Sequence, residues 1–297
     1  MLPKGIIPSL NTPFTADDRV DQASLIRLVE DCVDAGCAGL LALAVAGETA
    51  SLEVLERDRV LAAVMEGNRG RLPVIVGVSA PDLATSIARA RRAVAAGSSA
   101  ILWQPPGPME EDRLQAALSE LGDQGTGTVV LQDLDWQGEG LPIRSITRLF
   151  ERVEAFRAIK IETVRAGPKY TEVLAATGGA LHVSGGWAVT QMIEALERGV
   201  HAFMPTGMER VYVEIHRCFA AGRADEARAL FEAALPALAF ANQHIDVSIR
   251  FFKRLRAATG IFTTDRCRPP VPPLDPFQDS TAERLIRSAQ ALDARLG

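Results

Sequence analysis

Short apolar runs alternate with longer amphipathic segments along most of the chain. Eight of these runs are typical of buried strands, and they begin near Gly5, Gly39, Pro73, Ala100, Thr128, Phe156, Ala180 and Val200. Amphipathic helical segments lie between them, for example over residues 22–35, 54–66, 83–96, 113–121, 143–153 and 189–198. Nearly continuous apolar strands separated by crossover helices are typical of a parallel sheet covered on both faces. Eight such units favour a closed (β/α)8 TIM barrel of the α/β class.

The pattern changes after the eighth strand. Four helical segments follow, over residues 209–221, 224–239, 246–258 and 281–296, and no further strand is indicated. The segment Arg268–Asp279 is rich in proline, and we predict a non-helical connector because proline lacks the N–H that a helix interior uses. We therefore expect a barrel over residues 1–222 and a C-terminal helical extension over residues 223–297.

Composition narrows the class of protein. The 297 residues are 47% hydrophobic and 23% charged, which is ordinary for a globular protein. A net charge of −5 gives no general attraction to nucleic acid or to anionic membranes. No apolar stretch reaches the ~18 uncharged residues of a membrane span, and the N-terminus lacks the apolar core of a signal peptide. Four cysteines in this length form no disulfide framework, so we expect a cytoplasmic protein.

In a barrel of this kind, functional side chains lie at the C-terminal ends of the strands. Lys160 is the most informative of them, because it interrupts an apolar strand and because lysine is rarely buried unless it is paired or functional. Partial desolvation favours its neutral amine, which can attack a ketone and form a Schiff base. Glu162 lies two residues further on, on the same strand face. A structural ion pair between Lys160 and Glu162 explains the pattern equally well.

Other candidates end neighbouring strands. Gln132 and Asp133 end the fifth strand, and we expect both to face the barrel mouth, where they would bind a polar substrate or cap loop amides. Glu48 follows the second strand, where a helix-capping role is the simpler interpretation. Gly185 and Gly186 let the backbone approach a ligand closely, or form a plain turn.

Several common sites have no sequence signature here. The four histidines show neither HxH nor HxxxH spacing, so we expect no metal site. No GxGxxG or GxxxxGK[ST] motif indicates a nucleotide, and no GxSxG motif indicates a serine hydrolase. Cys32 and Cys37 have no CxxC partner and are expected to be small buried residues.

Taken in order, these segments resemble the dihydrodipicolinate synthase / N-acetylneuraminate lyase superfamily of Schiff-base class I aldolases. Gly5–Thr15 looks like the family's opening strand, and Ala44–Glu48 occupies the place of its G-T-T-G-E motif. The strand that ends near Lys160 looks like the one that carries the family's Schiff-base lysine. Ser184–Gly186 and Met204–Thr206 match its last two strand ends.

The resemblance implies a (β/α)8 barrel with C-terminal helices and a lyase that forms an imine through Lys160 with a 2-oxo acid. It implies no cofactor, and a homo-oligomer that is a dimer or a tetramer. Substrate contacts are expected from Ala46, Gly47, Glu48, Gln132, Gly185, Gly186 and Met204.

The chain departs from the family's pattern at catalytic positions. Val45 and Ala46 replace the two hydroxyl residues that bind the pyruvate carboxylate, so only backbone amides remain there. Gln132 replaces the tyrosine that ends strand five, and glutamine cannot act as a general acid–base. The arginine that binds a second substrate carboxylate aligns near Gln137. The lysine-biosynthesis reaction is therefore not expected, and sialic acid cleavage is disfavoured for the same reason.

Three interpretations remain. In the first, the protein is a lyase in which Lys160 forms the imine and Asp133, with Glu162 or Glu48 behind it, carries the proton. Such a lyase catalyses aldol cleavage, or dehydration of a 2-keto-3-deoxy sugar acid. The second is a catalytically impaired relative that binds a small metabolite. The third is a phosphate-binding barrel enzyme, which is disfavoured because no basic residue stands beside the paired glycines.

Overall fold

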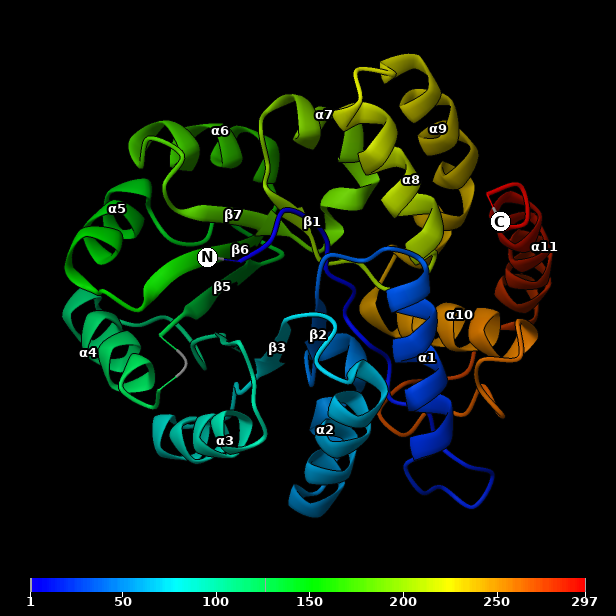
Figure 1. Ribbon diagram of the computed structural model, residues 1–297, viewed down its shortest axis with the longest axis horizontal. Coiled ribbons are helices and arrows are strands. Elements are labelled where there is room, and N and C mark those ends of the chain that lie inside the picture. Colours follow the sequence, from blue (N-terminus) through cyan, green and yellow to red (C-terminus); the bar gives the residue numbers. More distant parts are fainter. Residues whose placement is uncertain (1, 126, 297) are drawn as a thin grey trace. The chain divides into compact units, whose positions relative to one another are not determined.

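The computed structural model describes residues 2–125 and 127–296. The chain forms two compact units, each built from two segments (Figure 1). One unit comprises Met1–Lys4 and Pro73–Met204, and the other comprises Gly5–Leu72 and Pro205–Gly297.

The unit that contains Pro73–Met204 is built on six parallel strands. They are β3 (Val74–Gly77), β4 (Ala100–Trp103), β5 (Val129–Asp135), β6 (Phe156–Thr163), β7 (His182–Gly185) and β8 (Ala202–Phe203), and they lie side by side in sequence order. The crossover helices are α3 (Leu83–Ala95), α4 (Glu111–Gly122), α5 (Ile143–Arg152), α6 (Ala166–Ala176) and α7 (Met192–Glu197), the last preceded by the 3-10 turn Trp187–Gln191. Most strand residues are buried, as expected when helices cover one face and a core fills the other.

Register in this sheet decides which side chains share a face. Lys160 of β6 lies opposite Gln132 of β5 and Ser184 of β7. Asp133 lies one residue further along β5, opposite Ile161. Because successive side chains of a strand point to opposite faces, Gln132 and Asp133 face in opposite directions.

The second unit contains two strand segments and most of the long helices. Its elements are β1 (Gly5–Ile6), α1 (Gln22–Asp34), β2 (Leu40–Ala42), η1 (Val45–Gly47), η2 (Thr49–Ser51), α2 (Val54–Asn68), α8 (Glu209–Ala220), α9 (Ala224–Ala241), α10 (Ile245–Ala258) and α11 (Pro276–Asp293). The chain that follows β1 runs parallel to β2, since the Leu10 amide donates to the Leu41 carbonyl at 2.9 Å and the Leu41 amide donates to Pro8 at 2.9 Å.

The eight predicted strands are all present, and each predicted helix is found within a few residues. The helix α6 lies between the sixth and seventh strands and was not among the helices named from the sequence. One prediction was wrong: the proline-rich segment does not stay non-helical to Asp279, because α11 begins at Pro276. Proline at the first helical position loses no hydrogen bond, and the Asp275 carboxylate caps the amides of Phe277 and Gln278. The expected boundary between barrel and extension at residue 222 stays a prediction.

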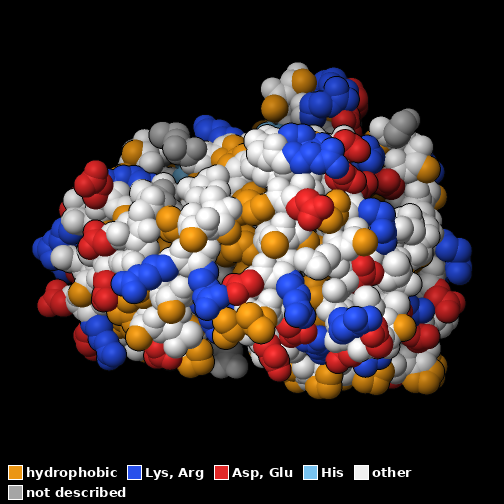
Figure 2. All heavy atoms as spheres, turned by 60° about the horizontal axis from the view of Figure 1, so that its bottom comes forward, with side chains coloured by type: hydrophobic (Ala, Val, Ile, Leu, Met, Phe, Trp, Pro, Cys, Tyr) orange, Lys and Arg blue, Asp and Glu red, His pale blue; other side chains and the backbone are white. Residues whose placement is uncertain are grey.

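The surface carries charges of both signs. On the face shown in Figure 2, acidic and basic side chains are interspersed and form no broad field of one sign. Within the described residues, no helix combines the length and apolar character needed to cross a membrane.

Candidate active site

Lysine is scarce in this chain, and most of its lysines are buried. Only four of the 32 Lys and Arg residues are lysines. Three of the four, Lys160, Lys169 and Lys253, are no more than 5% exposed. Each lies beside one of the three carboxylates predicted for the site, which are Glu162, Asp133 and Glu48 in that order. The contacts around the three pairs differ, and the differences indicate their functions.

Lys160 and Glu162 lie on the same face of β6, as their spacing predicts. Lys160 Nζ is 3.2 Å from Glu162 Oε2, and both side chains are 6% exposed. The Gln132 amide nitrogen donates to the same carboxylate oxygen at 2.7 Å. Within the described residues, Lys160 Nζ has this one partner and Glu162 Oε1 accepts no hydrogen bond. The pair therefore keeps donors and an acceptor free for a ligand.

Gly186 approaches the end of the Lys160 side chain very closely. A Cβ atom built on Gly186 would lie 2.3 Å from Glu162 Oε1 and 3.0 Å from Lys160 Nζ. Any side chain at this position would thus collide with the pair. Glycine leaves this space open, whereas a side chain here would have to displace the ends of the Glu162 and Lys160 side chains.

Two other residues predicted to contact the substrate, Gly185 and Met204, lie in the same unit as Lys160. Gly185 accepts a hydrogen bond from the Met204 amide at 3.0 Å, and Met204 is 2% exposed. Ser184, which lies opposite Lys160 in the sheet, points its hydroxyl at the Ile159 carbonyl (3.2 Å) and at Met204 Sδ (3.8 Å). Gly185 and Met204 thus lie next to Ser184, the residue opposite Lys160 in the sheet.

Asp133 does not share the face of Gln132, contrary to the expectation that both face the barrel mouth. Its Oδ2 lies 2.5 Å from Lys169 Nζ of α6, on the helix-covered face, and its Oδ1 accepts from the Leu141 amide at 2.9 Å. Burial raises the pKa of Asp133, and the neighbouring Lys169 opposes that rise. Both oxygens are engaged, so proton transfer by Asp133 stays a prediction that this geometry favours less than transfer by Glu162.

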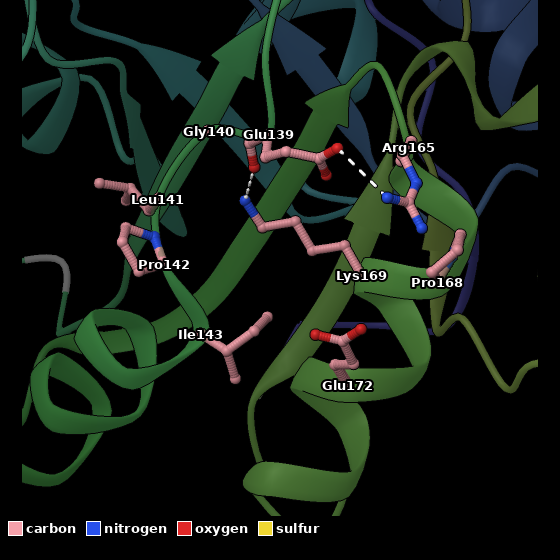
Figure 3. Close-up of a pocket in the computed structure, with 9 residues that line it drawn as sticks. All are labelled: Glu139, Gly140, Leu141, Pro142, Ile143, Arg165, Pro168, Lys169 and Glu172. Atoms are coloured by element: carbon pink, nitrogen blue, oxygen red, sulfur yellow. Dashed lines mark hydrogen bonds and ion pairs between the residues drawn. The ribbon is translucent and has the colours of Figure 1, made fainter.

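A cavity of about 330 Å³ lies next to this second pair (Figure 3). It is lined by the loop after β5 and by the first turns of α6, including Glu139, Arg165 and Glu172. Lys169 crosses it and donates to the Glu139 carbonyl at 2.5 Å, while Arg165 lies 3.8 Å from the Glu139 carboxylate. Neither Lys160 nor Glu162 lines this cavity. Lys169 therefore ties the loop after β5 to α6.

The turn that resembles the family's G-T-T-G-E motif belongs to the other unit. Ala46 and Gly47 are buried, and their carbonyls accept from Asn11 Nδ2 (2.8 Å) and Thr12 Oγ1 (2.7 Å). The Gly47 amide donates to Ala44 at 2.9 Å, whereas the Ala46 amide donates no hydrogen bond within the described residues. If this turn binds a carboxylate, as predicted, the Ala46 amide is therefore available to donate to it and the Gly47 amide is not.

Glu48 is buried and bonded at both oxygens. Oε1 lies 2.5 Å from Lys253 Nζ of α10, and Oε2 accepts from the Arg268 amide at 2.8 Å. A role for Glu48 in capping the following helix is not what this geometry shows, since its carboxylate contacts residues of the C-terminal segment. Lys253 and Lys169 were not predicted from the sequence, although the scarcity of lysine is a signal that points to them.

No tyrosine ends a strand of this chain. Its two tyrosines lie in α6 and α8, and both are buried. Tyr170 donates to the Ile161 carbonyl at 3.3 Å from the helix side of β6. Within the described residues, no group of three or more His, Cys, Asp or Glu side chains is arranged to hold a metal ion.

Residues 2–289 match the Dihydrodipicolinate synthetase family. The chain is 29% identical over 299 residues to an L-2-keto-3-deoxyarabonate dehydratase of Azospirillum brasilense, an alignment covering 98% of this chain and 94% of the relative. A 4-hydroxy-tetrahydrodipicolinate synthase of Salinibacter ruber is 37% identical over 106 residues, which cover 36% of this chain and 35% of that protein.

Solved structures confirm the fold class. A sialic acid aldolase of Ruminococcus gnavus superposes with a TM-score of 0.89 at 18% identity, covering all of both chains. A prophage protein of the dihydrodipicolinic acid synthase family from E. coli K12, solved in complex with pyruvate, superposes with a TM-score of 0.87 at 22% identity, covering 98% of this chain and 99% of that one. The predicted (β/α)8 barrel with C-terminal helices is the fold of these relatives. The chain belongs to the dihydrodipicolinate synthetase family, a family of lyases.

Proposed function

We propose that this protein is a Schiff-base lyase that dehydrates a 2-keto-3-deoxy sugar acid, with Lys160 as the imine-forming residue. One observation carries the proposal: of the carboxylates in the three buried lysine–carboxylate pairs, only Glu162 keeps an oxygen that accepts no hydrogen bond within the described residues, and its lysine lies at the longest distance, 3.2 Å. Lys169 and Lys253 each lie 2.5 Å from a carboxylate whose other oxygen is also bonded.

The proposed reaction begins with attack of the neutral Lys160 amine on the C2 carbonyl of the substrate. Water leaves C2, and a protonated imine forms. A proton then leaves C3, and its electron pair forms an enamine. The enamine expels the C4 hydroxyl, which takes up a proton and leaves as a second water. Hydrolysis of the unsaturated imine consumes one water and restores the Lys160 amine, so the net change is loss of one water.

We propose that Glu162 carries the protons. Its free Oε1 can take the C3 proton and return a proton to the departing hydroxyl, as general acid–base catalysis requires. Gln132 holds the other oxygen at 2.7 Å and so fixes the carboxylate beside Lys160. This arrangement offers a route for the proton in a chain without the family's strand-five tyrosine.

Dehydration is favoured over aldol cleavage because the relative aligned over nearly the whole chain is named a dehydratase. Incubation with 2-keto-3-deoxyarabonate and related sugar acids, followed by mass spectrometry, separates the two reactions. Dehydration gives a product that keeps every carbon and lacks one water, whereas aldol cleavage releases pyruvate. Pyruvate as the main product would overturn the dehydratase proposal, and no turnover of any member of the panel would favour the impaired, metabolite-binding relative.

The expected substrate is a small 2-oxo acid and the expected oligomer is a dimer or tetramer, both by analogy with the family. Sedimentation analysis tests the second expectation, and a monomer at micromolar concentration would contradict it.

A further inference from the structure

Two of the three tryptophans of this chain contact each other within the unit that carries Lys160. The ring centroids of Trp136 and Trp187 lie 5.5 Å apart, and the ring planes are tilted by 31°. Trp136 is 46% exposed, and Trp187 is partly exposed as well. Much of the apolar surface of these two large rings is therefore left uncovered.

The tryptophan pair lies on the same face of the sheet as Lys160. Trp136 directly follows β5, and the alternation of that strand places its side chain on the face of Gln132, which is opposite Lys160. Trp187 directly follows Gly186, and a Cβ atom built on Gly186 would lie 3.0 Å from Lys160 Nζ. Because β6 lies between β5 and β7, the contact between the two indoles passes over the C-terminal end of the strand that carries Lys160. Uncovered aromatic rings beside a reactive group are typical of ligand sites.

Both indoles extend from turns that are closed by local hydrogen bonds. Asp135 Oδ1 accepts from the Gln137 amide at 3.1 Å and so fixes the backbone around Trp136. The Thr190 hydroxyl donates to the Trp187 carbonyl at 2.8 Å. A surface that is already ordered loses less entropy when a ligand binds to it.

The chemistry of the two rings favours a planar apolar occupant. Indole faces offer no hydrogen-bond acceptor, and each ring has a single N–H donor. The hydroxyls of a sugar acid would therefore have to find partners elsewhere in the site. An aromatic ring needs no such partners, and it stacks on an indole in an offset or edge-to-face arrangement.

We propose that Trp136 and Trp187 form an aromatic subsite beside Lys160 that binds the planar, apolar end of a 2-oxo acid. This inference rests on the proposed function, since Lys160 would form the imine with the oxo group of the same molecule. It adds 2-oxo acids with an aromatic end to the class of molecules that the site accepts, besides the sugar acid proposed above.

Competitive trapping on the full-length protein tests the subsite. Pyruvate and 4-phenyl-2-oxobutanoate are supplied together at equal, non-saturating concentrations and reduced onto the protein with cyanoborohydride. Mass spectrometry then gives the ratio of the two adducts on the peptide that contains Lys160. Both acids form the same bond to the same lysine, so a change of this ratio between variants reports on the aromatic end.

The variants remove one ring at a time. Trp136→Ala and Trp187→Ala delete an indole, and Trp136→Phe keeps an aromatic ring in its place. Trp136 is the decisive position, because a half-exposed side chain leaves little core packing to lose. Phe150→Ala is the matched control, since Phe150 is a partly exposed ring in α5 that contacts Arg157, three residues from Lys160 along β6 and thus on its opposite face.

We expect the wild type to favour the phenyl adduct and each alanine variant to lower the adduct ratio by about tenfold, roughly the loss of one stacking contact. Trp136→Phe should stay closer to the wild type than to Trp136→Ala, and Phe150→Ala should match the wild type. An unchanged ratio in folded Trp136→Ala would overturn the inference, as would an equal loss in Phe150→Ala.

A second ligand separates failure of this inference from failure of the proposed function. The acid 4-phenylbutanoate lacks the oxo group and cannot form an imine, and its binding is followed by tryptophan fluorescence. Saturable binding that weakens in Trp136→Ala, with no adduct on Lys160 from either oxo acid, would support the subsite and refute imine formation. A pyruvate adduct on Lys160 with the same adduct ratio in the wild type and in Trp136→Ala would refute the subsite alone. Absence of both adducts and of saturable binding would refute both.

Discussion

Buried lysines in this protein differ in how closely they approach their carboxylates and in what else surrounds them. Lys169 contacts both the Asp133 carboxylate and the Glu139 carbonyl, and Lys253 is enclosed by Glu48 and an aromatic ring. Lys160 has Glu162 alone within the described residues, at a longer 3.2 Å. An amine that must leave its partner and attack a carbonyl is better served by the looser pair.

Replacing Glu162 by glutamine should impair proton transfer without removing the imine-forming lysine. We expect Glu162→Gln to lower kcat by about a hundredfold or more, the usual contribution of a general acid–base. Borohydride should still trap pyruvate on Lys160. Steady-state kinetics and adduct mass measure the two effects separately.

Asp133→Asn provides the competing test. This substitution breaks a buried ion pair, so it should lower the free energy of unfolding by about 3 kcal/mol. If folded Asp133→Asn loses more kcat than Glu162→Gln, the proton carrier is Asp133, as the sequence first indicated, and our assignment to Glu162 is wrong.

Gly186→Ala should block the space beside Lys160. The added methyl would meet Glu162 Oε1 at 2.3 Å, and overpacking of this kind costs about 1–3 kcal/mol. We expect at least a tenfold slower trapping of Lys160, on the order of the rate loss that such a barrier change produces. Gly107→Ala is the control, because a Cβ atom at Gly107 meets nothing within 4 Å. Trapping of Lys160 at the normal rate in Gly186→Ala would show that Gly186 does not lie this close to Lys160 and Glu162 in solution.

At the scale of elements, β7 carries a histidine that folding keeps neutral. His182 Nε2 lies 3.0 Å from the Pro3 carbonyl, and its ring stacks on His201 at 5.1 Å between centroids. Burial lowers the pKa of His182 from 6.5 to about 4. The unfolded chain therefore binds a proton more readily than the folded protein between these pH values.

This difference predicts acid lability. The stabilising contribution of neutral His182 is present above pH 6.5 and is lost as the pH falls towards 4, by about 3 kcal/mol. The free energy of unfolding, measured with denaturant at a series of pH values, should fall over this range. In His182→Asn the slope of that free energy against pH should be smaller by the amount that about one proton contributes. An unchanged slope in His182→Asn, compared with a similar substitution at the exposed His244, would contradict the assignment.

The order and type of elements could be predicted because apolar runs and amphipathic segments have distinct periods. The start of α11 could not, because a capping aspartate and a first-turn proline outweigh the usual reading of a proline-rich segment. The facing of Asp133 was missed for a different reason. Successive side chains of a strand face opposite ways, so Gln132 and Asp133 could not both face the mouth, and only the pairing of the strand decides which of the two does.

At the scale of the whole molecule, the family and its (β/α)8 fold could be predicted from the order of strand ends, from Gly5 to Thr206. The Lys160–Glu162 pair could also be predicted from its spacing, but the partners of Lys169 and Lys253 could not, because those pairs join residues far apart in the chain. Lys253 and Glu48 are separated by 205 positions. Contacts of that kind arise from tertiary packing, which local patterns do not encode.

The central claim is that Lys160 alone forms the imine, and borohydride reduction with pyruvate tests it most directly. With only four lysines in the chain, peptide mapping assigns the adduct without ambiguity. We predict one pyruvate-derived adduct, on the peptide that contains Lys160, and none in Lys160→Arg, which keeps the charge but cannot form the imine. An adduct on Lys169 or Lys253, or an undiminished adduct in Lys160→Arg, would contradict this account.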